Sequence, residues 1–427
     1  MEPDHIMDIK PRKNFDRNYW AMTFEGAAFM GGMTMLATNT VVAVFIDTMT
    51  GSKTLVGLAI TAQALFFLIG QMLVAPYANS IRNIPIFMFR LMLLRVIPVF
   101  MAVPLFLGVG AGPAVVIFLV LYSLFWLSDG LNTIPWGELA ARAIKTELRG
   151  HMMGMQVVIG GAFSLLTGLL LARLLETPLL TDNHRFGTIF VIGAVILMTS
   201  IFFIRLVKDP SPVLNPEKPD LRRYYAEIPA IIKSSKPLRR GLVARIPGYV
   251  GFSAITFMVV FGSNALDLTA AQVSWLVYSQ IVGSLIGGSV LGEASRWFGN
   301  KAVILMANSG VIITLCMAVV LTVFPGLGYT WLIVICVFTG ICTNNWVGYF
   351  NYFLDIAPKE NRPMFQFIGN CIGIPFSFIG YALGYMIDRL GYNAVFIFGV
   401  VCAGLTIFLS LRLLSRKKIN ALREEAQ

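Results

Sequence analysis

Long apolar runs separated by short polar stretches dominate the chain. A membrane-spanning helix needs about 20 mostly apolar residues, because each residue adds 1.5 Å across a hydrocarbon core of about 30 Å. These runs are too long for barrel strands and do not alternate, so we expect helices, which satisfy their backbone hydrogen bonds in lipid. Twelve runs qualify, at residues 19–47, 54–78, 85–108, 113–138, 150–175, 186–206, 241–263, 270–294, 301–324, 329–355, 363–387 and 392–414. The sequence thus predicts an all-α integral membrane protein with twelve transmembrane helices.

A hydrophilic break divides these runs into six and six. Residues 207–240 contain six prolines among many charges, which argues against one continuous helix. Residues 221–234 could still form a short amphipathic helix on the membrane surface. We therefore expect an N-terminal six-helix bundle over 1–206, a cytoplasmic linker over 207–240 and a C-terminal six-helix bundle over 241–427.

The composition supports a membrane protein. Apolar residues make up 57% of the chain and charged residues 13%, with a mean hydropathy of +0.75. This excludes a soluble enzyme, a nucleic-acid-binding domain and a disulfide-stapled secreted module. With the N-terminus placed inside, 27 of the 33 Lys and Arg fall on the cytoplasmic side, 4 in outer loops and 2 within a span. The positive-inside rule then predicts a multi-pass protein of the cytoplasmic (inner) membrane with both termini in the cytoplasm.

Metal, cofactor and covalent chemistry lack a sequence basis. The five cysteines lie in apolar runs without Cys-x-x-Cys spacing, so disulfides and a zinc site are not expected. The three histidines are far apart and are expected to cluster with nothing. No group is placed for covalent catalysis, and we expect neither an enzyme nor a metal site nor a cofactor.

The two halves show signs of an internal repeat. Shifting the first half by 213 positions brings Asn132 onto Asn345, Arg149 onto Arg362 and Trp136 onto Tyr349. With the six-plus-six hydropathy pattern, these matches favour two pseudo-symmetric bundles over an unrelated arrangement.

At this point the chain resembles the major facilitator superfamily. Residues 292–301, Gly-Glu-Ala-Ser-Arg-Trp-Phe-Gly-Asn-Lys, are similar to the loop that follows helix 8 in that superfamily, with Arg296 where an acid normally stands. Residues 351–363 are similar to the helix 10–11 junction of many bacterial members. The resemblance implies a monomer in which two six-helix domains rock around a central cavity. Helices 1, 4, 7 and 10 would line that cavity, and helices 2, 5, 8 and 11 would form the sliding interface.

Glycines agree with a close interface between helices. Gly283, Gly287, Gly288 and Gly292 repeat at helical spacing in helix 8, and Gly380 and Gly384 do so in helix 11. Small residues at i and i+4 let helices approach closely. This pattern fits either a gating seam or ordinary static packing.

Charged side chains inside the spans are candidates for proton coupling. A charge at the bilayer centre costs at least about 2.5–3.5 kcal/mol on insertion scales, so it is kept for function or pairing. Glu25, Arg95 and Asp129 lie at similar depths in helices 1, 3 and 4. We expect Asp129 to pair with Arg95 and Glu25 to carry the exchangeable proton. The alternatives are a purely structural ion pair and a solvated Glu25 at the cavity mouth.

Amide and aromatic side chains on helices 4, 7 and 10 form the candidate substrate site. Amides fix orientation by hydrogen bonds, and rings stack on flat, apolar or cationic groups. An alternative for Trp136 and Tyr349 is a place in the interfacial aromatic belt. The candidate substrate-binding residues are Asn132, Trp136, Tyr249, Asn344, Asn345, Trp346 and Tyr349.

Charges at the cytoplasmic junctions are candidates for a gate. They could form a latch that holds one conformer, or they could be solvated loop charges that set topology. The candidate gating residues are Arg149, Glu293, Arg296, Asp355 and Arg362.

The sequence favours a secondary transporter that moves a small organic solute by alternating access, coupled to protons. A lining rich in methionine and aromatic residues, with one or two carboxylates, slightly favours antiport that exports amphipathic or cationic compounds. Uptake of a polar metabolite, lipid flipping and a non-transporting assembly role on the same scaffold remain open. An anionic substrate would need a free arginine, and Arg245 is expected to be a topology charge instead. The expected partners are the solute, protons and membrane lipids, and not nucleic acid.

Overall fold

The computed structural model describes residues 12–176, 180–209, 220–258, 261–262, 266, 268 and 270–424. The expected structure of the first 11 residues and of residues 210–219 in the linker lies outside the described residues. Every regular element in the described part of the chain is a helix, which agrees with the predicted all-α class.

Six expected spans form the first half, and several of them are broken. Prolines and polar residues interrupt the helical backbone hydrogen bonding of spans 1 and 3. Spans 4 to 6 each form one long helix. The elements are α1 (Arg12–Thr34), η1 (Thr38–Val42), α2 (Ala43–Thr50), α3 (Lys53–Val74), η2 (Ala75–Ser80), α4 (Ile84–Met92), η3 (Leu93–Val96), α5 (Ile97–Phe106), α6 (Ala111–Ala143), α7 (Thr146–Glu176) and α8 (Asp182–Leu206).

The linker contains two short helices where one amphipathic helix was expected. They are α9 (Leu221–Ala226) and α10 (Ile228–Ser234), separated just before Pro229. Asp220 caps α9 by accepting hydrogen bonds from the backbone N–H groups of Arg222 and Arg223.

The second half begins a few residues earlier than expected, since its first helix starts at Lys236 rather than at residue 241. Its tenth span is divided at Thr343 and Asn344, and its eleventh span is divided before Pro375. The elements are α11 (Lys236–Ile255), α13 (Ala270–Phe298), α14 (Asn300–Val323), η4 (Pro325–Leu327), α15 (Gly328–Cys342), α16 (Asn345–Ile356), η5 (Lys359–Asn361), α17 (Arg362–Cys371), η6 (Pro375–Phe378), α18 (Ile379–Ser410) and α19 (Arg416–Glu424). A kink at Gly391, with a φ of 80°, separates spans 11 and 12 within α18.

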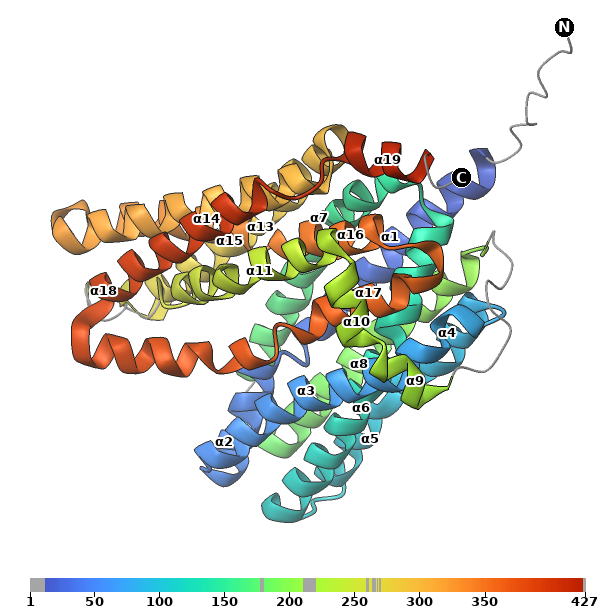
Figure 1. Ribbon diagram of the computed structural model, residues 1–427. Coiled ribbons are helices and arrows are strands. Elements are labelled where there is room, and N and C mark those ends of the chain that lie inside the picture. The colour runs from blue at the N-terminus through green and yellow to red at the C-terminus, as the bar shows by residue number, and fades with distance from the viewer. Residues whose placement is uncertain are drawn as a thin grey trace, which may run out of the picture.

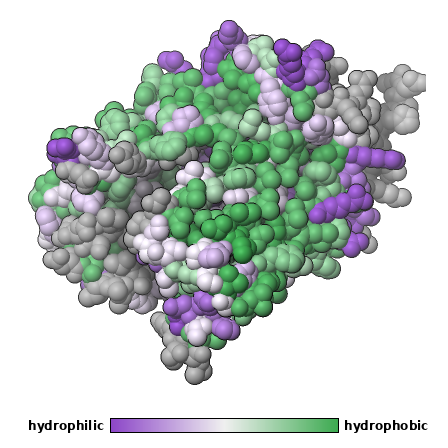
Figure 2. Space-filling view, turned by 90° about the horizontal axis from the view of Figure 1, so that it is seen from below, coloured by the Kyte–Doolittle hydropathy of each residue, from purple (hydrophilic) through white to green (hydrophobic). Residues whose placement is uncertain are grey.

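Nine helical segments of the described chain are long and apolar enough to cross a membrane. They correspond to expected spans 2–6, 8–10 and 12. Spans 1 and 11 are broken, and span 7 is described only in part. Apolar side chains cover most of the face in Figure 2, while hydrophilic side chains gather at its margins, as expected for a surface that faces lipid.

The two halves pack as separate bundles that meet along a few helices. In the first half α1 packs on α7 and α8, and α3 packs on α6; in the second half α11 and α14 pack on α18, and α13 packs on α15. Between the halves, the main contact joins α7 to α13. The halves lie close together near the chain termini and diverge at the opposite ends of α2, α5, α14 and α18 (Figure 1).

Candidate functional site

A cavity of about 480 Å³ lies between the two halves. Its first-half wall comes from α1, α3, α4, η3, α6 and α7, and its second-half wall comes from α13, the break between α15 and α16, and α16 itself. Apolar and aromatic side chains dominate the lining, with a few polar groups, as in solute-binding cavities generally. The polar and charged residues in this lining are Glu25, Arg95, Asp129, Asn132, Thr133, Gln156, Ser284, Thr343 and Asn344.

The three charged candidates from the first half meet at this cavity. The Arg95 Nη1 atom lies 3.2 Å from Oε1 of Glu25, and its Nη2 atom lies 3.8 Å from Oδ1 of Asp129. Glu25 and Arg95 are 3% and 5% exposed, so the charges are taken out of bulk water. Two carboxylates therefore share one guanidinium in a confined space.

Arg95 pairs with Asp129 as expected, and it has a second carboxylate partner in Glu25. Glu25, rather than Asp129, is the closer partner of Arg95, and Glu25 also accepts a hydrogen bond from Trp136 Nε1 at 3.0 Å. Glu25 is buried and not solvated at the cavity mouth. No hydrogen-bond donor other than Arg95 approaches the Asp129 carboxylate in the described part of the chain.

Arg95 also contacts two residues that the sequence analysis did not single out. The guanidinium donates to the hydroxyl of Ser200 on α8, and it lies 4.7 Å from the centre of the Phe29 ring. Phe29 is one α-helical turn beyond Glu25, a spacing that could have suggested the contact, whereas Ser200 is distant in sequence.

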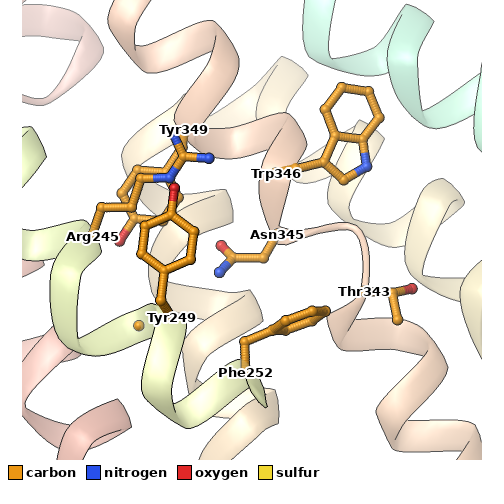
Figure 3. Close-up of a pocket in the computed structure, with 8 residues that line it drawn as sticks. Arg245, Tyr249, Phe252, Thr343, Asn345, Trp346 and Tyr349 are labelled. Carbon is orange, nitrogen blue, oxygen red and sulfur yellow. The ribbon is translucent and has the colours of Figure 1, made fainter. Parts of the chain in front are cut away.

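The repeated asparagine and aromatic pairs line two separate pockets. Asn132 and Trp136 on α6 face the larger cavity. Asn345 and Tyr349 on α16 face a smaller pocket of about 250 Å³, beside Tyr249 and Arg245 of α11 (Figure 3). The amide oxygens of both asparagines are buried without a hydrogen-bond donor in the described chain.

Asn344 and Trp346 join these pockets. Asn344 lines the larger cavity and donates from Nδ2 to the Ser284 carbonyl at 2.9 Å. Trp346 and Thr343 line both pockets at the break between α15 and α16. Tyr349 is only 2% exposed, which argues against the interfacial-belt alternative for this residue.

Ion pairs between the halves close the end that carries the termini. The Arg149 Nη2 atom on α7 lies 2.9 Å from Oδ1 of Asp355 on α16. Asp355 also accepts a hydrogen bond from Asn300 Nδ2 at 2.6 Å. The Arg362 Nη1 atom lies 3.9 Å from Oε1 of Glu138. These pairs thus cross from one half to the other.

Glu293 and His151 make a second contact between the halves. The His151 Nε2 atom lies 3.0 Å from Oε1 of Glu293, and the Nδ1 atom of the same ring lies 2.6 Å from the Tyr19 hydroxyl. The expectation that the histidines cluster with nothing was therefore wrong for His151. Arg296 is half-exposed and pairs with Glu293 of its own helix at 3.7 Å, so it does not itself bridge the halves in this conformation.

Only some of the candidate glycines lie at the seam between the halves. A Cβ atom on Gly288 would lie 2.9 Å from the carbonyl oxygen of Gly154 on α7. Gly283 and Gly287 instead approach the backbone of α15 within the second half. Gly380 and Gly384 face open space, so they do not form the close helix interface expected in the eleventh span.

The linker helix α9 also spans the two halves. The Tyr225 hydroxyl donates to the carbonyl oxygen of Met72 on α3, and its ring centre lies 6.1 Å from that of Phe367 on α17. Burial raises the pKa of the neighbouring Tyr224 well above its usual value, which keeps this phenol neutral. The linker thus reinforces the same closed end.

Comparison with known proteins finds a family match for the second half of the chain. The family model of the Major Facilitator Superfamily matches residues 241–427. No curated protein matches the chain.

Several solved structures share the fold over nearly the whole chain. The E. coli fucose:proton symporter FucP has a TM-score of 0.71 at 12% identity, covering 93% of this chain and 98% of that one. The proton:xylose symporter XylE has a TM-score of 0.70 at 12% identity, covering 96% and 99%. A bacterial homologue of the iron transporter ferroportin, in its outward-facing state, has a TM-score of 0.68 at 11% identity, covering 92% and 98%.

These likenesses confirm the predicted twelve-helix fold. The sequence of the second half is thus similar to the Major Facilitator Superfamily, which the sequence indicated, and the whole chain has the fold of these solved transporters.

Proposed function

We propose that the protein is a proton-coupled secondary transporter that carries a small organic solute through the cavity between its halves by alternating access. The proposal rests on one observation: Glu25 and Asp129 share the single guanidinium of Arg95. One arginine can compensate only one carboxylate fully, and an unpaired carboxylate away from water favours the protonated form.

Asp129 is the proton site in this proposal. Glu25 has the closer contact with Arg95 and a second donor in Trp136, whereas the described part of the chain offers Asp129 only the guanidinium at 3.8 Å. The Asp129 side chain is 15% exposed, so water in the cavity can deliver or remove a proton. The geometry therefore moves the proposed exchangeable proton from Glu25 to Asp129.

The conformation supports an alternating-access cycle. Buried ion pairs join the halves at the end rich in Lys and Arg, and the halves diverge at the other end (Figure 1). We place the Lys- and Arg-rich end in the cytoplasm of a cell bounded by this membrane. The cavity then opens outward in this conformation, and the gating residues would separate in the opposite one.

The proposal can be tested without knowing the solute. Spin labels are attached at Lys145 and Lys359, which are exposed on opposite halves at the closed end, after the five native cysteines are replaced by alanine. We expect the wild-type distance distribution to shift between pH 5 and pH 9. The shift should disappear in Asp129→Asn and persist in the control Asp182→Asn, which removes an exposed carboxylate within one half.

Two outcomes would correct the proposal in different ways. A distribution that does not change with pH in the wild type would exclude proton coupling of this conformational change. A shift that persists in Asp129→Asn but is lost in Glu25→Gln would return the proton to Glu25.

Export of amphipathic cations by proton antiport is a second candidate. The surplus carboxylate lines the same cavity as Phe29, Trp136 and several methionines, which suit a cation with an apolar body. This candidate requires that tetraphenylphosphonium bind the purified protein, that protons compete with it, and that Asp129→Asn abolish binding. Equal binding to both proteins would rule out this site for cations.

A further inference from the structure

Arg245 lines the smaller pocket and has no carboxylate partner among the described residues. It projects from α11 together with Tyr249 and Phe252, opposite Asn345 and Trp346 at the start of α16 (Figure 3). A half-buried positive charge without a counter-ion is costly, because water is partly removed from it. The expectation that Arg245 is a simple topology charge does not explain this placement.

The surroundings hold the guanidinium in a fixed orientation. The rings of Tyr249 and Tyr349 have their centres 5.2 and 5.3 Å from the Arg245 Cζ atom. The Nη1 atom donates to the carbonyl oxygen of Gly369 at 2.7 Å. A guanidinium has five N–H donors, and in the described chain only this bond to Gly369 uses any of them. The remaining donors form a preoriented fork, which is the geometry that binds a carboxylate in a bidentate manner.

A second group in the pocket also lacks a partner. The Asn345 side-chain oxygen is buried and receives no hydrogen bond from the described chain. Whichever way its amide is turned, one polar atom is left facing the pocket. Asn345 is also the first residue of α16, whose N-terminus has no side-chain cap and carries partial positive charge.

We infer that this pocket binds the anionic head of a small organic solute with a flat apolar body. Arg245 binds the anionic head, and Asn345 assists it. The apolar body would lie against Phe252 and Trp346, which line the same pocket. This inference rests on the proposed transport function and names the class of its substrate.

The position of the pocket connects this site to the proton site. Thr343 and Trp346 line both the smaller pocket and the larger cavity that contains Asp129. An anion at Arg245 and a proton on Asp129 would therefore occupy adjoining sites on opposite halves. Their combined charge is zero, so one anion would cross with one proton without moving net charge.

Three probes of nearly equal shape test the inference: 3-phenylpropionate, its neutral amide 3-phenylpropanamide and the cation 3-phenylpropylamine. Binding to the full-length detergent-purified protein is measured by isothermal titration calorimetry at pH 7. We expect the carboxylate to bind at least tenfold more tightly than the amide, and the amine to bind most weakly. Arg245→Gln should remove this preference, and Arg245→Lys should keep part of it because a point charge replaces the fork.

Two further variants separate binding from folding. Asn345→Asp keeps Arg245 but places a carboxylate beside it, and it should abolish binding of 3-phenylpropionate. Arg90→Gln removes an exposed arginine from another span and should leave the affinity unchanged. Carboxylate preference that survives in Arg245→Gln, tightest binding of the amine, or no binding of the carboxylate at millimolar concentration would each overturn the inference.

The same assay separates this inference from the proposed function. Asp129→Asn should keep the preference for the carboxylate while losing the pH-dependent change in the label distances. Arg245-dependent binding in a protein without that change would support the anion site and overturn proton coupling. A pH-dependent change without carboxylate preference would do the reverse.

Discussion

Single side chains in the cavity differ in how completely they are satisfied. Glu25 has both a guanidinium and an indole N–H as partners, whereas among the described residues Asp129 has only a more distant guanidinium. Arg245 and Asn345 are likewise left with unused polar atoms. Unpaired polar groups are costly in a structural core, so their concentration in two adjoining pockets points to ligands rather than to stability.

The indole of Trp136 should contribute measurably to stability. Trp136→Phe removes the 3.0 Å hydrogen bond to a buried carboxylate, and a hydrogen bond to a charged group is worth about 1.5–3 kcal/mol. We expect the thermal unfolding midpoint to fall by several degrees. Trp346→Phe is the matched control, since the Trp346 indole makes no hydrogen bond in the described chain and is 43% exposed. Equal shifts in both variants would show that the hydrogen bond contributes little.

Breaks and close contacts, rather than regular helices, mark the functional parts of the elements. The tenth span is divided into α15 and α16 where the two pockets meet. Discontinuous helices in transporters direct the ends of half-helices toward substrates, and the N-terminus of α16 lies at both pockets. Close contact is found in span 8, which forms α13. Its glycines let α13 contact α7 almost backbone to backbone.

A larger side chain at the α7–α13 contact should open the closed end. A Cβ on Gly288 already lies 2.9 Å from the Gly154 carbonyl oxygen, so Gly288→Leu cannot be accommodated unless the helices separate. We expect longer distances between the labels at Lys145 and Lys359. Gly384→Leu is the control, because a Cβ at that position meets open space. Unchanged distances in Gly288→Leu would mean that this contact does not move during the cycle.

At the level of the molecule, charge pairs join the two halves at one end. Arg149 and Asp355 are 1% and 6% exposed, and Asn300 binds the second carboxylate oxygen. Arg362 and Glu138 form a second crossing pair. The linker helix α9 adds an apolar contact over the same end through Tyr225.

Breaking the Arg149–Asp355 pair should shift the whole molecule toward the opposite state. Asp355→Asn leaves a buried guanidinium without a counter-ion, and removing one partner of a buried pair costs about 3–5 kcal/mol. Opening this end returns Arg149 to water, so we expect longer distances between the labels at Lys145 and Lys359.

A charge reversal tests whether the pair itself is responsible. The double variant Arg149→Asp with Asp355→Arg should recover part of the short-distance population, because opposite charges again face each other. Asp182→Asn should have no effect, since its exposed pair with Arg185 lies within one half. Short distances retained in Asp355→Asn would show that other contacts close this end.

The spans, the six-plus-six division and the strong bias of positive charge to one side can be read from the amino-acid order alone. These features follow from lipid solvation of each segment, which acts residue by residue along the chain. The same reasoning identified Glu25, Arg95 and Asp129, because charges stand out in apolar runs. It also predicted that Asn132 and Asn345 occupy equivalent positions, and each now faces its own pocket.

Which of these groups meet depends on how the helices pack against one another. Arg95 lies closer to Glu25 than to Asp129, Arg149 reaches Asp355 across the halves, and His151 contacts Glu293. Sequence spacing determines the faces of one helix, but distances between helices depend on how their surfaces pack. For the same reason the pocket around Arg245 could not be predicted from the sequence. It forms only where α11 meets the break between α15 and α16.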